Sequence, residues 1–179
     1  PSSLWLREIL NSLFDIKDLS EIAPEASFAK INQMLASPEF KPLALFKKFN
    51  IEVLATTDST NDNLAAHKKL SEIELSGKVI PTFRPDDITD PARKDFKSSI
   101  SSLGATDYAT LVSKLKERRS YFKSMGATAT DHGIFSPRTL RMSDADKEKL
   151  FQDVLNGSRF DEYRAVMLFE FAKMSSEDG

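Results

Sequence analysis

Three short stretches of the chain end in side chains that could bind or transform a small polar molecule. In order along the sequence, they end at Asp58, at Arg84, and at the pair Asp131 and His132. An arginine presents a planar fork of donors that suits a carboxylate. A carboxylate and an imidazole can both be tuned to transfer protons near neutral pH. This set of side chains suits a polar, anionic, hydroxyl-rich ligand.

Each of these side chains also has a purely structural explanation. Asp58 could cap the helix that follows it, and His132 could shape a turn. Arg84, which stands between two prolines that stiffen its backbone, could pair with Asp86 or Asp87. Any one of these short motifs is a weak signal, whereas three at successive strand ends are a stronger one.

The segments around these motifs alternate between short apolar runs and helical patterns. We expect strands at 51–55, 78–83 and 127–131, and helices at 60–73, 94–103 and 107–125, the last capped by Thr106. The acidic, proline-bounded stretch 86–91 is expected to be a solvent-facing loop. Because the carboxyl ends of parallel strands collect at one edge, we expect Asp58, Arg84, Asp131 and His132 to face one common cleft.

The chain is expected to have three parts. Residues 1–48 form a helical subdomain, because apolar residues recur at helical spacing and Pro24 and Pro42 open helices. Residues 49–135 hold three β-α units of an incomplete barrel. Residues 136–179 form a helical hairpin and tail.

The composition excludes several classes of protein. Hydrophobic residues make up 40% and charged residues 29%, the balance of a soluble globular protein, and the net charge of −2 gives no reason to expect nucleic acid or an anionic membrane as a partner. The absence of cysteine excludes disulfides and thiolate zinc sites. Two histidines are too few for a histidine-rich metal site. No transmembrane run or signal peptide is apparent, and a cytoplasmic location is expected.

The motifs, taken together and in order, resemble those of the uronate isomerase (glucuronate isomerase) family. The resemblance covers nearly the whole chain and rests on Asn50–Asp58, then Asp62, Leu64 and His67, then Pro81–Asp86, then Thr130–Gly133. The chain departs from the family after Asp58, where Ser59 and Thr60 replace the usual acid and proline.

This resemblance implies a fold, an activity and a set of site residues. The family belongs to the amidohydrolase superfamily, so the expected fold is α/β, a fragment of a (β/α)8 TIM-type barrel with about three parallel strands and an added helical subdomain. The implied reaction is aldose–ketose isomerisation of D-glucuronate to D-fructuronate and of D-galacturonate to D-tagaturonate. Asp131 and His132 would be catalytic, and Arg84 and Asp58 would bind the substrate.

The family's metal ligands would lie outside this chain, on the first and the later barrel strands. We therefore expect no metal in this fragment, a divalent metal such as zinc in the full-length parent, and no activity from the fragment alone. Its open sheet edges favour self-association or a homo-oligomer. Three other functions stay open: a non-catalytic module that binds sugar acids or a partner, a hydrolase of the amidohydrolase type, and a helical scaffold domain without a small-molecule site, in which Arg84 and Asp131 would lie far apart.

Overall fold

The computed structural model describes residues 2–17 and 23–178, which divide into two compact units. The first unit consists of Pro1–Glu52 with Glu74–Lys78, and the second of Val53–Ile73 with Val79–Gly179. The expected helical subdomain, 1–48, falls within the first unit. The second unit contains the expected barrel segment, 49–135, except for 49–52 and 74–78, together with the expected helical tail.

The first unit is built from helices that begin at prolines. It comprises α1 (Ser2–Phe14), α2 (Pro24–Ala36), the short 3-10 helix η1 (Pro38–Phe40) and α3 (Pro42–Lys48). Proline suits the first helical turn because its missing N–H would have no partner there. A small core of Leu10, Phe14 and Ile16 is closed by Phe40, whose ring stacks on Phe14 at 5.3 Å between centroids.

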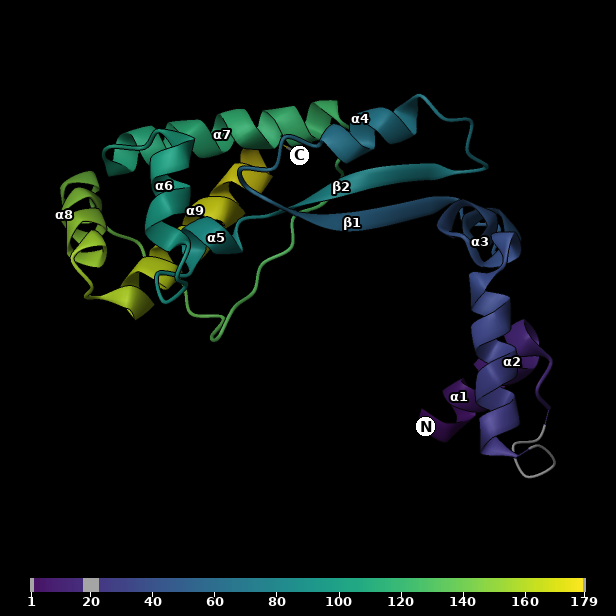
Figure 1. Ribbon diagram of the computed structural model, residues 1–179. Helices are drawn as coiled ribbons and strands as arrows, with labels where there is room; N and C mark the ends of the chain where they lie inside the picture. The colour runs from purple at the N-terminus through teal and green to yellow at the C-terminus, as the bar shows by residue number, and fades with distance from the viewer. Residues whose placement is uncertain (1, 18–22, 179) are drawn as a thin grey trace. The chain divides into compact units, whose positions relative to one another are not determined.

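The sheet consists of two neighbouring strands, β1 (Val53–Ser59) and β2 (Lys78–Arg84), joined through α4 (Ala65–Ser71). The two strands run in the same direction (Figure 1). A third segment joins β2 in parallel through a single bridge between Phe83 and Thr130. The expected strand 127–131 is thus reduced to one pairing, because its alanine and threonine side chains offer little surface to bury.

Five further helices complete the second unit. They are α5 (Asp86–Thr89), α6 (Phe96–Leu103), α7 (Tyr108–Ser124), α8 (Asp144–Leu155) and α9 (Phe160–Asp178). Phe83 of β2 is buried against two of them, meeting Phe122 edge-on at 5.0 Å and Phe171 at 6.2 Å. Because side chains alternate along a strand, this burial of Phe83 directs its neighbour Arg84 to the opposite face.

Four details of the predicted secondary structure were wrong. The stretch 86–91 is not a solvent-facing loop, since it contains α5, in which Asp87 and Ile88 are buried. The first strand lies at Val53–Ser59 instead of 51–55. The helix expected at 60–73 begins only at Ala65, after Leu64 adopts a left-handed conformation with φ of 52°. Asp107, and not Thr106, caps α7, in a capping box with Thr110.

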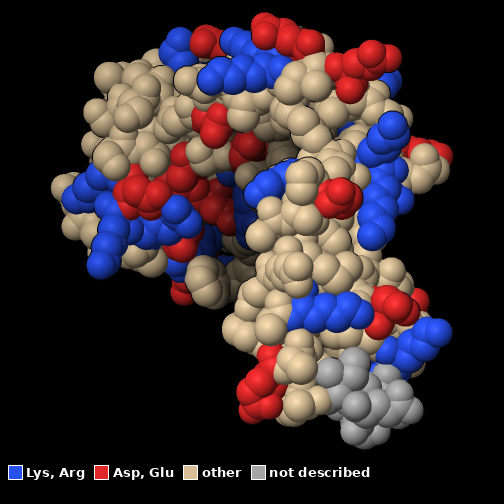
Figure 2. All heavy atoms as spheres, turned by 45° about the vertical axis from the view of Figure 1, so that its right-hand side comes forward, with Lys and Arg blue, Asp and Glu red and all other residues tan. Residues whose placement is uncertain are grey.

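Charges of both signs are spread over the surface. Figure 2 shows lysine and arginine side chains interspersed with aspartate and glutamate on the face that it draws. Within the described ranges, no helix is long and apolar enough to cross a membrane.

Candidate active site

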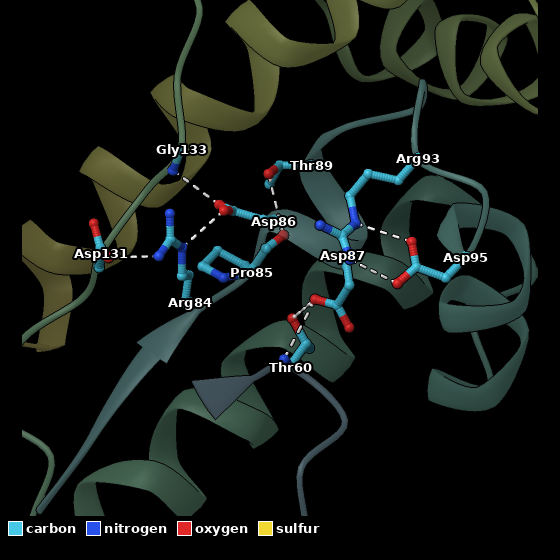
Figure 3. A network of polar contacts seen from close by, with 10 residues as sticks. All are labelled: Thr60, Arg84, Pro85, Asp86, Asp87, Thr89, Arg93, Asp95, Asp131 and Gly133. Carbon is cyan, nitrogen blue, oxygen red and sulfur yellow. Dashed lines mark hydrogen bonds and ion pairs between the residues drawn. The ribbon is translucent and has the colours of Figure 1, made fainter. Parts of the chain in front are cut away.

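Arg84 stands at the end of β2, where it is held by two carboxylates from different parts of the chain. Its Nε donates to Asp86 Oδ2 at 2.8 Å, and its Nη1 lies 3.4 Å from Asp131 Oδ2 (Figure 3). The hydrogen bond that Arg84 donates to Asp86 raises the pKa of Arg84 above its ordinary value, so the guanidinium stays charged. The side chain is 41% exposed and therefore open to a ligand.

Asp131 and His132 follow the single bridge to β2. The backbone there is tied to β2 by two hydrogen bonds, from Phe83 N to Ala129 O at 3.3 Å and from Asp131 N to Phe83 O at 3.0 Å. These bonds bring Asp131 beside Arg84. The parallel arrangement that the sequence predicted for these two strand ends is confirmed at this point.

His132 is half-buried, and its ring lies against Phe171 with 4.9 Å between centroids. Burial lowers the pKa of His132 below its ordinary value, and this effect outweighs the opposing pull of Asp86 and Asp131. The imidazole is therefore neutral at pH 7 and has a lone pair that can accept a proton.

Among the described residues, Asp58 has no hydrogen bond or ion pair with these groups, and its partners are Thr56 and His67. Thr56 Oγ1 donates to Asp58 Oδ2 at 2.7 Å and lies 2.8 Å from His67 Nε2. Since the hydroxyl has one proton and gives it to Asp58, His67 must donate from Nε2. His67 belongs to α4, so Thr56 and Asp58 occupy the helix-covered face of β1. The structure thus brings Arg84 and Asp131 into contact, with His132 as the next residue along the chain and its ring against Phe171. Asp58 belongs to a separate polar cluster.

The sequence analysis gave Asp86 only a structural role as an alternative partner of Arg84. The structure shows it in contact with a second strand end as well, because Asp86 Oδ1 accepts from the Gly133 amide at 2.8 Å. The next residue, Asp87, accepts from the hydroxyl of Thr60 at 2.9 Å. The only signal in the sequence was the pair of acids directly after Arg84 and Pro85, which does not reveal partners so distant along the chain.

A cavity of about 280 Å³ opens beside His132. Its lining includes His132, Phe135, Arg138, Asp161, Arg164 and Phe171. It combines apolar walls with a few charged groups, as small-molecule sites commonly do. Of the three side chains assigned to the candidate active site, His132 lines this cavity, whereas Arg84 and Asp131 do not.

The possible metal-ligating side chains of the described residues do not converge on one point. Within residues 2–17 and 23–178, there is no group of three or more histidine, aspartate, glutamate or cysteine side chains that could hold a metal ion. A metal in the full-length parent stays a prediction.

Comparison with known proteins covers the whole chain. A model of the glucuronate isomerase family matches residues 1–179. The uronate isomerases of Phenylobacterium zucineum and Nostoc punctiforme are 37% and 38% identical to it over 190 aligned positions, which include all of this chain and 40% of each relative.

Solved structures give the same result. The glucuronate isomerase from Caulobacter crescentus superposes with a TM-score of 0.89 at 32% identity, over all of this chain and 40% of that protein. The uronate isomerase from Thermotoga maritima, at 23% identity, has a TM-score of 0.86 over 99% of this chain and supports the fold alone. The chain spans about 40% of the length of these relatives and has the α/β fold of part of a (β/α)8 barrel. It belongs to the glucuronate isomerase family.

Proposed function

We propose that this chain is part of an isomerase that interconverts D-glucuronate with D-fructuronate, and D-galacturonate with D-tagaturonate. The family match supports the reaction. The observation that carries the site assignment is the meeting of Arg84 with Asp131, next to His132, at the ends of adjacent parallel segments.

Arg84 is the group that holds the carboxylate of the sugar acid. Its contacts to described residues use Nε and Nη1, so Nη2 is the nitrogen left to face the ligand. The contact to Asp131 is long, at 3.4 Å, and a substrate carboxylate can replace it. A charge-assisted hydrogen bond of this kind also fixes the orientation of the sugar.

Asp131 and His132 are the groups that transfer protons. In the aldose-to-ketose direction, a proton leaves C2 and its electron pair forms an enediol. A proton is then added at C1, and the hydroxyl proton passes from O2 to O1, so the atoms balance. A neutral His132 or the Asp131 carboxylate can take the first proton.

Further parts of the proposal rest on how much of its relatives' length this chain spans. This chain spans 40% of its relatives, so we propose that the fragment alone is inactive and that the full-length protein binds the divalent metal. A cytoplasmic location and self-association through the sheet edges complete the proposal. A substrate-binding role for Asp58 also stays a prediction, and its contacts with Thr56 and His67 argue for an indirect one.

The test is the substitution Arg84→Met in the full-length protein. We expect KM for D-glucuronate to rise roughly tenfold or more, with a smaller change in kcat, because a ground-state contact is lost. Arg93→Met is the matched control, because Arg93 also pairs with the aspartate two positions later and is similarly exposed, at 43%. An unchanged KM in Arg84→Met removes the assigned role. Binding of D-glucuronate without any turnover in the wild type favours the non-catalytic module, and hydrolysis without isomerisation favours the amidohydrolase alternative.

A further inference from the structure

Asp86 uses its two oxygens for two different strand ends. Oδ2 accepts from Arg84 Nε at 2.8 Å, and Oδ1 accepts from the Gly133 amide at 2.8 Å (Figure 3). The first bond fixes the guanidinium at the end of β2. The second fixes the backbone directly after His132. One carboxylate therefore connects the residue that binds the substrate to the segment that transfers protons.

The space around Gly133 shows how closely this carboxylate is fitted. A Cβ atom added at Gly133 would lie 2.7 Å from Asp86 Oδ2, 3.2 Å from its Cγ and 3.3 Å from its Oδ1. All three nearest atoms belong to Asp86, so the carboxylate occupies the volume that a side chain at position 133 would need. Glycine at 133 and aspartate at 86 are therefore sterically linked.

Strand pairing alone does not hold the segment from Thr130 to Gly133 in place. Within the described residues, the bridge between Phe83 and Thr130 is the one strand pairing that joins this segment to β2, and regular pairing stops before His132. The bond from Gly133 to Asp86 is the next tie along the backbone. The direction in which His132 leaves the sheet depends on that tie.

We propose that Asp86 is a positioning residue that sets the distance between Arg84 and the Asp131–His132 pair. This inference rests on the proposed function, because it assumes that these three side chains act on one substrate. Asp86 does not touch the reacting atoms. It acts through the guanidinium on one side and through the Gly133 amide on the other.

The test is a double-mutant cycle in the full-length protein with Asp86→Ala, Gly133→Ala and the pair. Asp86→Ala loses both ties, so we expect KM to rise and kcat to fall, each by roughly tenfold or more. Gly133→Ala places a methyl group against Asp86 Oδ2, the oxygen that holds Arg84 Nε, and also shifts the backbone after His132, so we expect KM to rise and kcat to fall in this variant too. Because Asp86→Ala removes the three atoms nearest to the new methyl group, adding Gly133→Ala to it should change either constant by less than about twofold.

Asp95→Ala is the matched control. Asp95 accepts from Arg93, two positions earlier, at 2.9 and 2.7 Å. Because Asp95 lies outside the site, KM and kcat of Asp95→Ala should stay at wild-type values. If Asp86 only stabilised the fold, Asp86→Ala would reduce the active fraction, lowering kcat with KM unchanged, and the two substitutions would act additively. Either result overturns the proposal.

Hydrogen–deuterium exchange separates this inference from the proposed function. We expect faster exchange in the peptide that contains Gly133 in Asp86→Ala, and wild-type exchange there in Asp95→Ala. If the full-length protein has no isomerase activity and this exchange still increases, the proposed function fails while the tie stands. If the wild type is active and Asp86→Ala leaves exchange and both kinetic constants unchanged, the inference fails while the function stands.

Discussion

The hydroxyl of Thr60 donates to Asp87 Oδ1 at 2.9 Å, and the Thr60 amide donates to the same oxygen at 3.3 Å. Both residues are buried, and they lie 27 positions apart in the sequence. The bond joins the residue after β1 to the helix that follows β2. Asp86 and Asp87 together thus connect all three strand ends of the second unit.

Thr60→Val should destabilise the protein, because it keeps the shape of the side chain and leaves a buried carboxylate without its hydroxyl donor. Loss of a hydrogen bond to a charged group costs about 1.5–3 kcal/mol in free energy of unfolding. Urea unfolding measures the change. Thr89→Val is the control, since its hydroxyl bonds only the Pro85 carbonyl of its own helical turn, and we expect a cost below about 1 kcal/mol. Equal losses in the two variants would contradict the special role of the buried pair.

Asp87 should also make stability depend on pH. Burial raises the pKa of Asp87 above the ordinary 3.8, more than its bonds to Thr60 lower it. The folded state then holds its proton to a higher pH than the unfolded state does. The contribution of Asp87 to stability is therefore greatest below pH 3.8 and declines as pH rises through the raised value. Asp87→Asn should gain stability relative to wild type between pH 3.8 and 7, as measured by urea unfolding at each pH. A difference in free energy of unfolding between Asp87→Asn and wild type that does not vary with pH would refute the raised pKa of Asp87.

Phe171→Leu should raise the pKa of His132 toward 6.5, because a smaller side chain uncovers the imidazole. NMR titration of the ring protons reports the pKa directly. A lowered histidine pKa contributes stability that is complete above pH 6.5 and is lost as pH falls below that value. The free energy of unfolding of Phe171→Leu should therefore depend less on pH in that range than that of the wild type. Phe169→Leu on the same helix is the control, because Phe169 packs on Arg141 instead. The explanation by burial fails if both variants leave the His132 titration unchanged.

Asp178→Asn should weaken the attachment of α9 to α7. Arg119 is 6% exposed, and Asp178 accepts from its Nε at 2.9 Å and its Nη2 at 2.7 Å. These bonds lower the pKa of Asp178, so their contribution is present above pH 3.8 and is lost as pH falls through the lowered value. We expect Asp178→Asn to lower the free energy of unfolding by about 2 kcal/mol near pH 7, and this difference should disappear in strong acid. Glu177→Gln, which removes an exposed pair with Lys116, should produce no measurable change in thermal unfolding.

Local signals predicted much of the fold. Pro24 and Pro42 open α2 and α3 as expected from the sequence. The helix expected at 94–103 ends at Leu103 as expected, where Gly104 adopts a left-handed conformation. Each of these signals works within one helical turn. For that reason it can be recognised without knowing which segments meet in the folded protein.

The errors arise where a distant contact decides the local structure. The stretch that begins at Asp86 reads as a polar loop, but Thr60 supplies a partner for Asp87 and lets α5 be buried. The helix expected at 60–73 starts only at Ala65, because Thr60 is bonded to Asp87. Thr106 and Asp107 are adjacent, and both have side chains that can cap a helix, so the sequence does not show which of them caps α7. In the structure it is Asp107.

The site itself was predicted in part. Placing Arg84 and Asp131 together needed only the rule that parallel strands end at one edge. Asp58 was harder, because a shift of one position along a strand moves a side chain to the other face. Thr56 and Asp58 share the face that α4 covers, and the sequence of β1 has polar residues on both faces, so its pattern did not reveal this.

The single bridge at Phe83 and Thr130 has a consequence for how this family can vary. With so little pairing to fix the backbone, the identities of residues 86 and 133 must be compatible with each other for the loop to keep its path. Natural sequences that lack the aspartate should be released from the requirement for glycine, and those with a larger residue at 133 should carry a shorter side chain at 86. An alignment of relatives would therefore show these two positions changing as a pair, independently of the residues that contact the sugar.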